Sequence, residues 1–170
     1  MNKLWILIGS LFLCTGYDLW GQQVSNPIFE AKIRSTIDFT IPIISCNLLQ
    51  DRLQEQEVFL LDAREEQEYN VSHIDQAIHV GYDHFDLQKL RTIPKHAILI
   101  VYCSIGYRSE KIGERIKAMG YTKVYNLYGG IFEWVNTGQE VVDKTGQSTK
   151  YIHTYNQEWS KYVYTGKKVY

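Results

Sequence analysis

The chain has 170 residues, of which 45% are apolar and 22% charged, and its formal net charge is -1. This length suits one globular domain with short extensions, because single domains usually contain about 100–150 residues. The small net charge gives no reason to expect a nucleic-acid partner, since proteins that bind nucleic acid usually carry a strongly basic surface.

The first residues resemble a targeting segment. A positive charge near the start precedes the apolar run 4–13, which is too short to span a bilayer but has the length of a signal-peptide core. The sequence therefore predicts a signal peptide over 1–21, export to the periplasm and no stable membrane span. A lipoprotein anchored through Cys14 is the alternative, although Leu13 lies where such a signal normally has a small residue.

The following segments begin an alternation of strands and helices. Residues 22–40 have a weak pattern and are expected to form a lead-in that lies along the domain. Residues 41–45 predict a short edge strand, because their proline cannot donate to a central ladder. Ser45 can cap a helix over 46–55, and the continuously apolar run 58–62 predicts a strand buried on both faces.

The alternation continues to about residue 142. The acidic run 65–69 is typical of a helix start, where the backbone dipole favours negative charge. Apolar periodicity and end signals predict the remaining elements: a strand over 77–80, a helix over 83–91, a strand over 97–102, a helix over 108–119, a strand over 123–127 and a short helix around Trp134. This order predicts an α/β fold, with a mostly parallel central sheet of about five strands and helices on both faces.

Residues 143–170 form a C-terminal extension of different composition. Its apolar residues recur at helical spacing and predict one amphipathic helix that presents Ile152, Tyr155, Trp159, Tyr162 and Val163 on one face. The favoured interpretation is a helix docked on its own domain. A lid near the site, or a helix that binds a partner, is the alternative.

The segment from Cys103 to Arg108 carries the clearest functional pattern. A buried strand ends at Cys103, a helix begins near Arg108, and Gly106 allows a tight turn between them. Successive backbone N–H groups in such a loop point inward, and the helix start adds partial positive charge. This setting favours a thiolate and would hold the anion that forms when the sulfur is modified. We therefore predict that Cys103 is a nucleophile.

The run 103–109, Cys-Ser-Ile-Gly-Tyr-Arg-Ser, resembles the active-site loop Cys-x-x-Gly-x-Arg of rhodanese-like sulfurtransferases. Three further segments are similar to the family's pattern, in the same order along the chain: 61–69, 73–78 and 127–134. Ser72 and the pair 75–76 depart from that pattern in a surface turn, where the family usually has glycine and Pro-Gly. The resemblance covers about 43–142 and predicts a rhodanese-like domain over 41–142.

The resemblance implies a persulfide cycle that needs no metal or organic cofactor. Cys103 would take sulfur from a donor such as thiosulfate and pass it to an acceptor such as cyanide or a thiol. The loop residues that would bind the sulfur are Ser104, Ile105, Gly106, Tyr107 and Arg108. Arg108 would orient the donor or pair with a carboxylate such as Asp62, and Arg64 would tie its strand end to an acidic residue. The expected partners are therefore sulfur donors and acceptors, and no oligomeric state is predicted.

Two other functions stay open on the sequence alone. Related cysteine-dependent phosphatases and arsenate reductases place five residues between cysteine and arginine, whereas four separate Cys103 from Arg108, which suits a single sulfur atom. A non-enzymatic persulfide-binding or redox module would use Cys46 as a resolving thiol or disulfide partner. The favoured interpretation is that Cys46 is a small buried or capping residue. The five histidines show no metal-ligand spacing.

Overall fold

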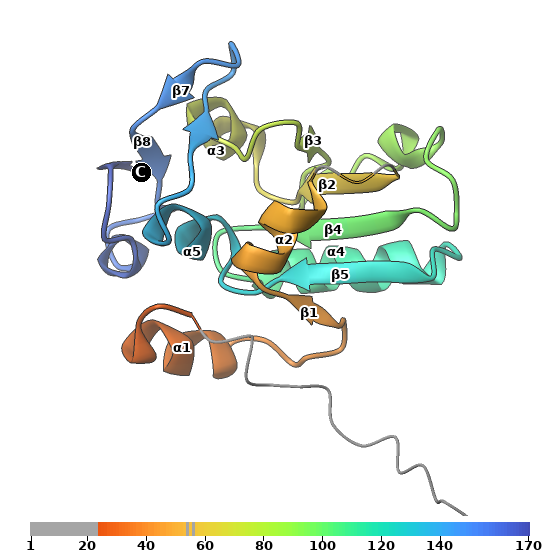
Figure 1. The fold of residues 1–170 in the computed structure, drawn as a ribbon, viewed down its shortest axis with the longest axis horizontal. Coiled ribbons are helices and arrows are strands. Elements are labelled where there is room, and N and C mark those ends of the chain that lie inside the picture. Colours follow the sequence, from red (N-terminus) through yellow and green to blue (C-terminus); the bar gives the residue numbers. More distant parts are fainter. Residues whose placement is uncertain (1–23, 54, 56) are drawn as a thin grey trace, which may run out of the picture.

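The computed structural model describes residues 24–53, 55 and 57–170, so the predicted signal peptide and Cys14 lie outside the described residues. Its centre is a five-stranded parallel sheet in the order β1-β5-β4-β2-β3 (Figure 1). The strands are β1 (Ile43–Ile44), β2 (Val58–Asp62), β3 (Ile78–His79), β4 (Ile98–Tyr102) and β5 (Lys123–Leu127). The predicted α/β fold is confirmed.

Helices pack on both faces of the sheet, with α2 in front of it and α4 behind it in Figure 1. The α-helices of the described residues are α1 (Pro27–Arg34), α2 (Cys46–Arg52), α3 (Glu66–Val71), α4 (Tyr107–Ala118) and α5 (Gly130–Asn136). Leu60, Ile100 and Tyr102 share one core cluster with residues of α1, α2 and α5. Leu61, Leu99 and Val101 point to the opposite face and share a second cluster with α4. This alternation follows from the two-residue period of a strand.

The helix expected over 83–91 was wrong. Only a short 3-10 turn, η2 (Leu87–Leu90), forms there, and the Asp86 side chain caps it by accepting from the N–H of Gln88 at 2.9 Å. The N–H of Asp86 itself donates to the carbonyl of Val80 at 2.9 Å. These bonds hold the preceding residues in an irregular loop, so a helix cannot begin before Asp86.

The lead-in over 22–40 contains the helix α1, which the periodicity did not reveal. Asn26 caps it by accepting from the N–H groups of Ile28 and Phe29 at 2.8 and 3.2 Å, and Pro27 is its first residue. This asparagine and proline are ordinary helix-start residues. The helix buries only Phe29 and Ile33, which is too few apolar positions for a clear period.

The long C-terminal helix was also wrong. In its place β6 (Val141–Val142) pairs with β7 (Ser148–Thr149), β8 (Tyr151–His153) pairs with β9 (Lys167–Val169), and η3 (Trp159–Tyr162) is a single 3-10 turn. The N–H of Thr154 donates to the carbonyl of Val169 at 2.8 Å, and Tyr155 has a φ of 65°, which ends any local helix. The segment nevertheless docks on its own domain, because Ile152, Tyr162 and Val163 are buried in the main core.

None of the helices in the described part of the chain is both long and apolar enough to cross a membrane.

Candidate active site

Cys103 lies directly after the last residue of β4, at the carboxyl edge of the sheet, and its side chain is almost completely buried. The loop that follows turns into α4 at Gly106, whose φ of 129° is unfavourable for other residues. Its N–H donates to the Cys103 Sγ at 3.2 Å. The predicted geometry, with a backbone donor aimed at the sulfur, is therefore present at this position.

The first turn of α5 holds the other side of the loop. The N–H of Ile131 donates to the Cys103 carbonyl at 2.9 Å, and that of Phe132 donates to the Ser104 carbonyl at 3.2 Å. These helix-start N–H groups have no partner within their own helix. Because they draw the loop carbonyls toward α5, the loop can direct N–H groups toward the sulfur.

Gly130 makes this approach possible. Its φ is 55°, and a Cβ there would lie 2.3 Å from the Cys103 carbonyl oxygen and 2.7 Å from that of Ser104. Any side chain at this position would displace the loop. Gly130, which lies in the segment 127–134 that carries the family resemblance, therefore has a structural purpose beside the nucleophile.

Ser109 contacts the nucleophile from within α4. Its Oγ lies 3.4 Å from the Cys103 Sγ and 2.7 Å from the Asn126 Oδ1. The Asn126 amide nitrogen donates to the Gly106 carbonyl at 2.9 Å, which orients its oxygen toward Ser109. The Ser109 hydroxyl can donate its single proton to a Cys103 thiolate. It can also donate that proton to Asn126, and its oxygen can then accept from a neutral Cys103 thiol.

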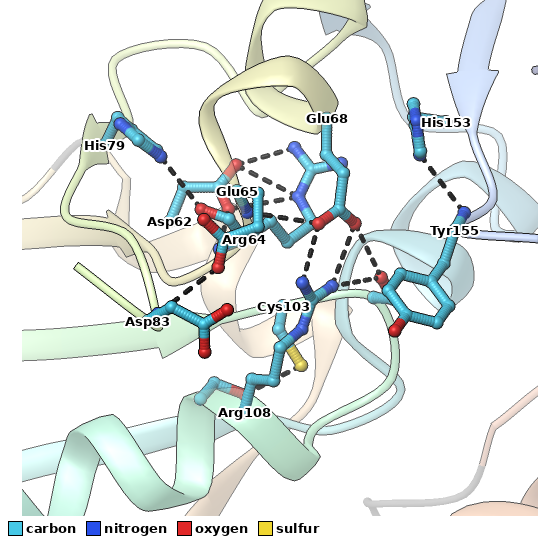
Figure 2. A network of polar contacts seen from close by, with 12 residues as sticks. Asp62, Arg64, Glu65, Glu68, His79, Asp83, Cys103, Arg108, His153 and Tyr155 are labelled. Atoms are coloured by element: carbon cyan, nitrogen blue, oxygen red, sulfur yellow. Dashed lines mark hydrogen bonds and ion pairs between the residues drawn. The ribbon is translucent and has the colours of Figure 1, made fainter. Parts of the chain in front are cut away.

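Arg108 pairs with Glu68 of α3 and not with Asp62, so that expected partner was wrong. Its guanidinium donates to the two Glu68 oxygens at 2.6 and 2.8 Å (Figure 2). It also donates to the Ser104 Oγ at 3.0 Å. Burial tends to raise the pKa of Glu68, but the hydrogen bonds and charge of Arg108, with Arg64 nearby, hold it below its usual value. The pair fastens the loop to α3.

Asp62 is already occupied by Arg64, as expected for a structural arginine. Both side chains are fully buried, and the guanidinium donates to the Asp62 carboxylate at 2.6 and 3.0 Å. Arg64 also donates to the carbonyl of Ser72 at 2.7 Å. Through these bonds Arg64 ties the end of β2 to the turn after α3.

A cavity of about 330 Å³ opens beside Cys103. Apart from loop residues, it is lined by Thr36, Glu65, Tyr82, Asp83, Tyr155 and Trp159. Tyr155 and Trp159 belong to the C-terminal extension, which therefore forms part of the site's wall. The alternative prediction placed the extension near the site, and this part of it agrees with the position of Tyr155 and Trp159.

Cys46 is buried at the start of α2 and lines a separate cavity of about 40 Å³. Both Cys46 and Cys103 are free thiols. Burial, with a smaller contribution from the charge of Glu133, raises the pKa of the Cys46 thiol, so it stays protonated and is a poor nucleophile. These observations favour a structural residue over a resolving thiol.

Sequence reasoning placed the loop correctly at a strand end but assigned no role to Glu68, Ser109 or Asn126. Glu68 lies within a segment that carries the family resemblance, and Ser109 directly follows the loop, so both positions were visible. Asn126 is a polar residue in a buried strand, and buried polar side chains need hydrogen-bond partners. This position could therefore have indicated a third residue of the site.

Comparison with protein families matches residues 45–137 to the rhodanese-like domain. Among curated proteins, the chain is 34% identical over 117 residues to a tRNA uridine(34) hydroxylase of Aster yellows witches'-broom phytoplasma, covering 66% of this chain and 38% of that protein. A tRNA uridine(34) hydroxylase of Escherichia coli O81 is 26% identical over 122 residues, covering 69% and 33%. The chain therefore spans well under half the length of these relatives.

Solved structures show the same fold. A thiosulfate sulfurtransferase from Pseudomonas aeruginosa matches with a TM-score of 0.55 and 25% identity, covering 80% of this chain and 25% of that one. A polysulfide-sulfur transferase from Wolinella succinogenes matches with a TM-score of 0.55 and 20% identity, covering 69% of this chain and 89% of that one.

Proposed function

The chain belongs to the rhodanese-like family, and we propose that it is a sulfurtransferase that carries sulfane sulfur on Cys103. The observation that carries the proposal is the environment of the sulfur atom. The Gly106 N–H donates to the Sγ at 3.2 Å, and the Ser109 Oγ lies 3.4 Å away. The site therefore offers donors to a sulfur that bears negative charge, beside an open cavity.

The reaction has two steps, each a transfer of one sulfur atom. The Cys103 thiolate attacks the outer sulfur of a donor such as thiosulfate, the donor's S–S bond breaks, and sulfite leaves with the electron pair. A nucleophile such as cyanide or a thiolate then attacks the outer sulfur of the persulfide, and Cys103 departs as the thiolate. Arg108 is paired with Glu68, so its part is to hold the loop.

The loop length supports sulfur transfer over hydrolysis of phosphate esters. Four residues separate Cys103 from Arg108, and the turn ends in the first residue of α4. A tetrahedral oxyanion would need a wider ring of N–H donors than this turn supplies. Tight binding of phosphate or arsenate next to Cys103, together with ester hydrolysis, would favour the phosphatase alternative.

Mass spectrometry after incubation with thiosulfate tests the proposal. We expect a gain of one sulfur atom, about 32 Da, that disappears on addition of cyanide and is absent from Cys103→Ser. The matched control is Cys46→Ser, which should still gain sulfur because Cys46 lies in a separate cavity. A wild-type protein that takes up no sulfur from any donor would contradict the proposal. The same spectrum, taken on protein expressed with its own N-terminus, distinguishes the proposed removal of residues 1–21 from the alternative, a lipid attached to Cys14.

The name of the curated relatives raises action on tRNA as a second candidate. Only sequence similarity favours it, and the activity for which these relatives are named belongs to proteins of which this chain spans 38% and 33%. A formal net charge of -1 supplies little attraction for a phosphate backbone. We expect filter-binding measurements to find no salt-dependent affinity for tRNA, and a steep salt dependence would revive this candidate.

A further inference from the structure

The positive charge of Arg108 is largely neutralised by Glu68 and therefore acts only weakly within the cavity. Arg108 is the one basic side chain among the described residues that line it. Two of its donor groups are bound to Glu68, at 2.6 and 2.8 Å, and the ring of Tyr155 lies 5.5 Å from the guanidinium carbon. An ion pair has no net charge, so this arginine offers little long-range attraction to an incoming anion.

Two carboxylates at the same cavity are not neutralised in this way. Glu65 and Asp83 both line it, and within the part of the chain that the structure describes neither forms an ion pair. The Glu65 Oε1 accepts the N–H of Asp83 at 3.2 Å, which holds the two residues together. In Figure 2 they lie to one side of Cys103, and Tyr155 lies to the other.

Aromatic side chains supply much of the remaining wall. Tyr82, Tyr107 and Trp159 line the cavity from three separate segments of the chain. Glu65 is partly buried beside these rings, whereas Asp83 is exposed, so the apolar wall reduces the screening by water mainly for Glu65. The faces of aromatic rings also attract cations, and Lys32 Nζ already lies 4.9 Å from the ring of Trp159. The site as a whole therefore favours a positive charge over a negative one.

We propose that the Cys103 cavity selects an acceptor thiol that carries a positive charge close to its sulfur. This inference rests on the proposed sulfurtransferase function. The acceptor's thiol proton passes to water, and its thiolate attacks the outer sulfur of the Cys103 persulfide. The persulfide S–S bond breaks, its electron pair stays on Cys103 as the thiolate, and the acceptor leaves as a persulfide. Glu65 and Asp83 hold the acceptor's cation during this attack.

A volume of about 330 Å³ is at the small end of ligand sites, so the acceptor's reacting part must be compact. A free aminothiol and a cysteine next to a lysine or arginine in a peptide share the required chemistry. The experiment below therefore includes one probe of each source.

The test uses the full chain loaded with sulfur from excess thiosulfate and measures the rate at which the persulfide is lost. Three small thiols of similar size differ in charge: 2-aminoethanethiol is cationic, 2-mercaptoethanol neutral and 3-mercaptopropionate anionic. The peptide Lys-Cys-Lys represents the protein source. Each rate is divided by the rate of the Glu65→Gln/Asp83→Asn double variant with the same thiol, so that the intrinsic reactivity of each thiol cancels.

We expect the double variant to lose roughly fivefold to tenfold in rate with the cationic thiols. Its rate with 2-mercaptoethanol should change by less than about twofold, and its rates with 3-mercaptopropionate and with thiosulfate as donor should rise. Changes of opposite sign cannot come from a damaged site. The matched control is Glu66→Gln, which removes an exposed carboxylate from the next position of α3 and should leave every rate unchanged.

The possible outcomes separate the two proposals. If the chain loads normally but the double variant responds equally to all three charges, the charge selection is wrong while sulfur transfer stands. If no sulfur is loaded on Cys103, both proposals fall together. A faster rate with Lys-Cys-Lys than with 2-aminoethanethiol would support a protein acceptor, and the reverse order would support a small aminothiol.

Discussion

Ser109 is the side chain that most directly accompanies the Cys103 sulfur, and it tests the geometry at the scale of a single residue. Its Oγ lies 3.4 Å from the sulfur and is held by Asn126 at 2.7 Å. We expect Ser109→Ala to slow sulfur loading by about tenfold, the effect of losing one hydrogen bond to a charged group. The measurement is the rate of loading from thiosulfate by mass spectrometry, with thermal unfolding as a check on folding. A folded variant that loads at the wild-type rate would show that the hydroxyl has no part in the chemistry.

The Arg108–Glu68 pair predicts a dependence of stability on acidity. The pKa of Glu68 is lower in the folded protein than its usual value of 4.5, because the hydrogen bonds and charge of Arg108 outweigh the opposing effect of burial. A lowered folded pKa means that this stabilisation is complete above about pH 4.5 and is lost as the pH falls through the folded value.

Glu68→Gln should remove this dependence. It leaves the partly buried Arg108 without its charged partner, so we expect the free energy of unfolding at pH 7 to fall by about 3 kcal/mol. Below pH 4.5 the variant should lose less further stability than the wild type does. Urea unfolding at a series of pH values measures both effects, and parallel pH profiles for the two proteins would contradict the assignment.

At the scale of elements, α5 supports the nucleophile because its N–H groups bind the carbonyls of Cys103 and Ser104. Gly130 sets the distance between α5 and the loop that contains Cys103. A methyl group on Gly130 would lie 2.3 Å from the Cys103 carbonyl oxygen, whereas one on Gly138 would meet nothing within 4 Å. Both glycines have positive φ, of 55° and 85°, so they share the conformational cost of alanine.

The pair Gly130→Ala and Gly138→Ala therefore separates steric contact from backbone strain. We expect Gly138→Ala to cost about 1 kcal/mol of stability and Gly130→Ala about 3 kcal/mol, with loss of sulfur loading only in the latter. Thermal unfolding and the loading assay measure these effects. Equal losses in the two variants would mean that α5 does not press against the loop.

At the scale of the whole molecule, the C-terminal extension belongs to the same core as the sheet. Ile152 is almost fully buried in a cluster that includes Phe29 of α1 and Phe132 of α5. We expect Ile152→Ala to lower the free energy of unfolding by about 3 kcal/mol in one cooperative transition with an unchanged denaturant slope. Tyr151→Ala is the matched control, since Tyr151 is exposed and should cost little. A separate early transition would show that the extension folds on its own.

The sequence by itself determined the parallel sheet, the helix after the loop and the position of Cys103 between them. Runs such as 58–62 and 123–127 matched the observed strands, because the apolar positions and end signals that predicted them are properties of neighbouring residues. The loop 103–108 is equally local, so its tight turn and backbone donor could be predicted from the order of its residues alone.

Only the tertiary structure decided which distant groups meet at the site. Arg108 pairs with Glu68, 40 positions away, because Asp62 is already bound by its neighbour Arg64. The spacing of apolar residues over 152–163 is that of a helix. However, residues 151–153 pair with β9 instead, and Tyr155 lines the cavity. Such outcomes depend on competition among partners across the whole fold, and the local pattern of residues does not contain that competition.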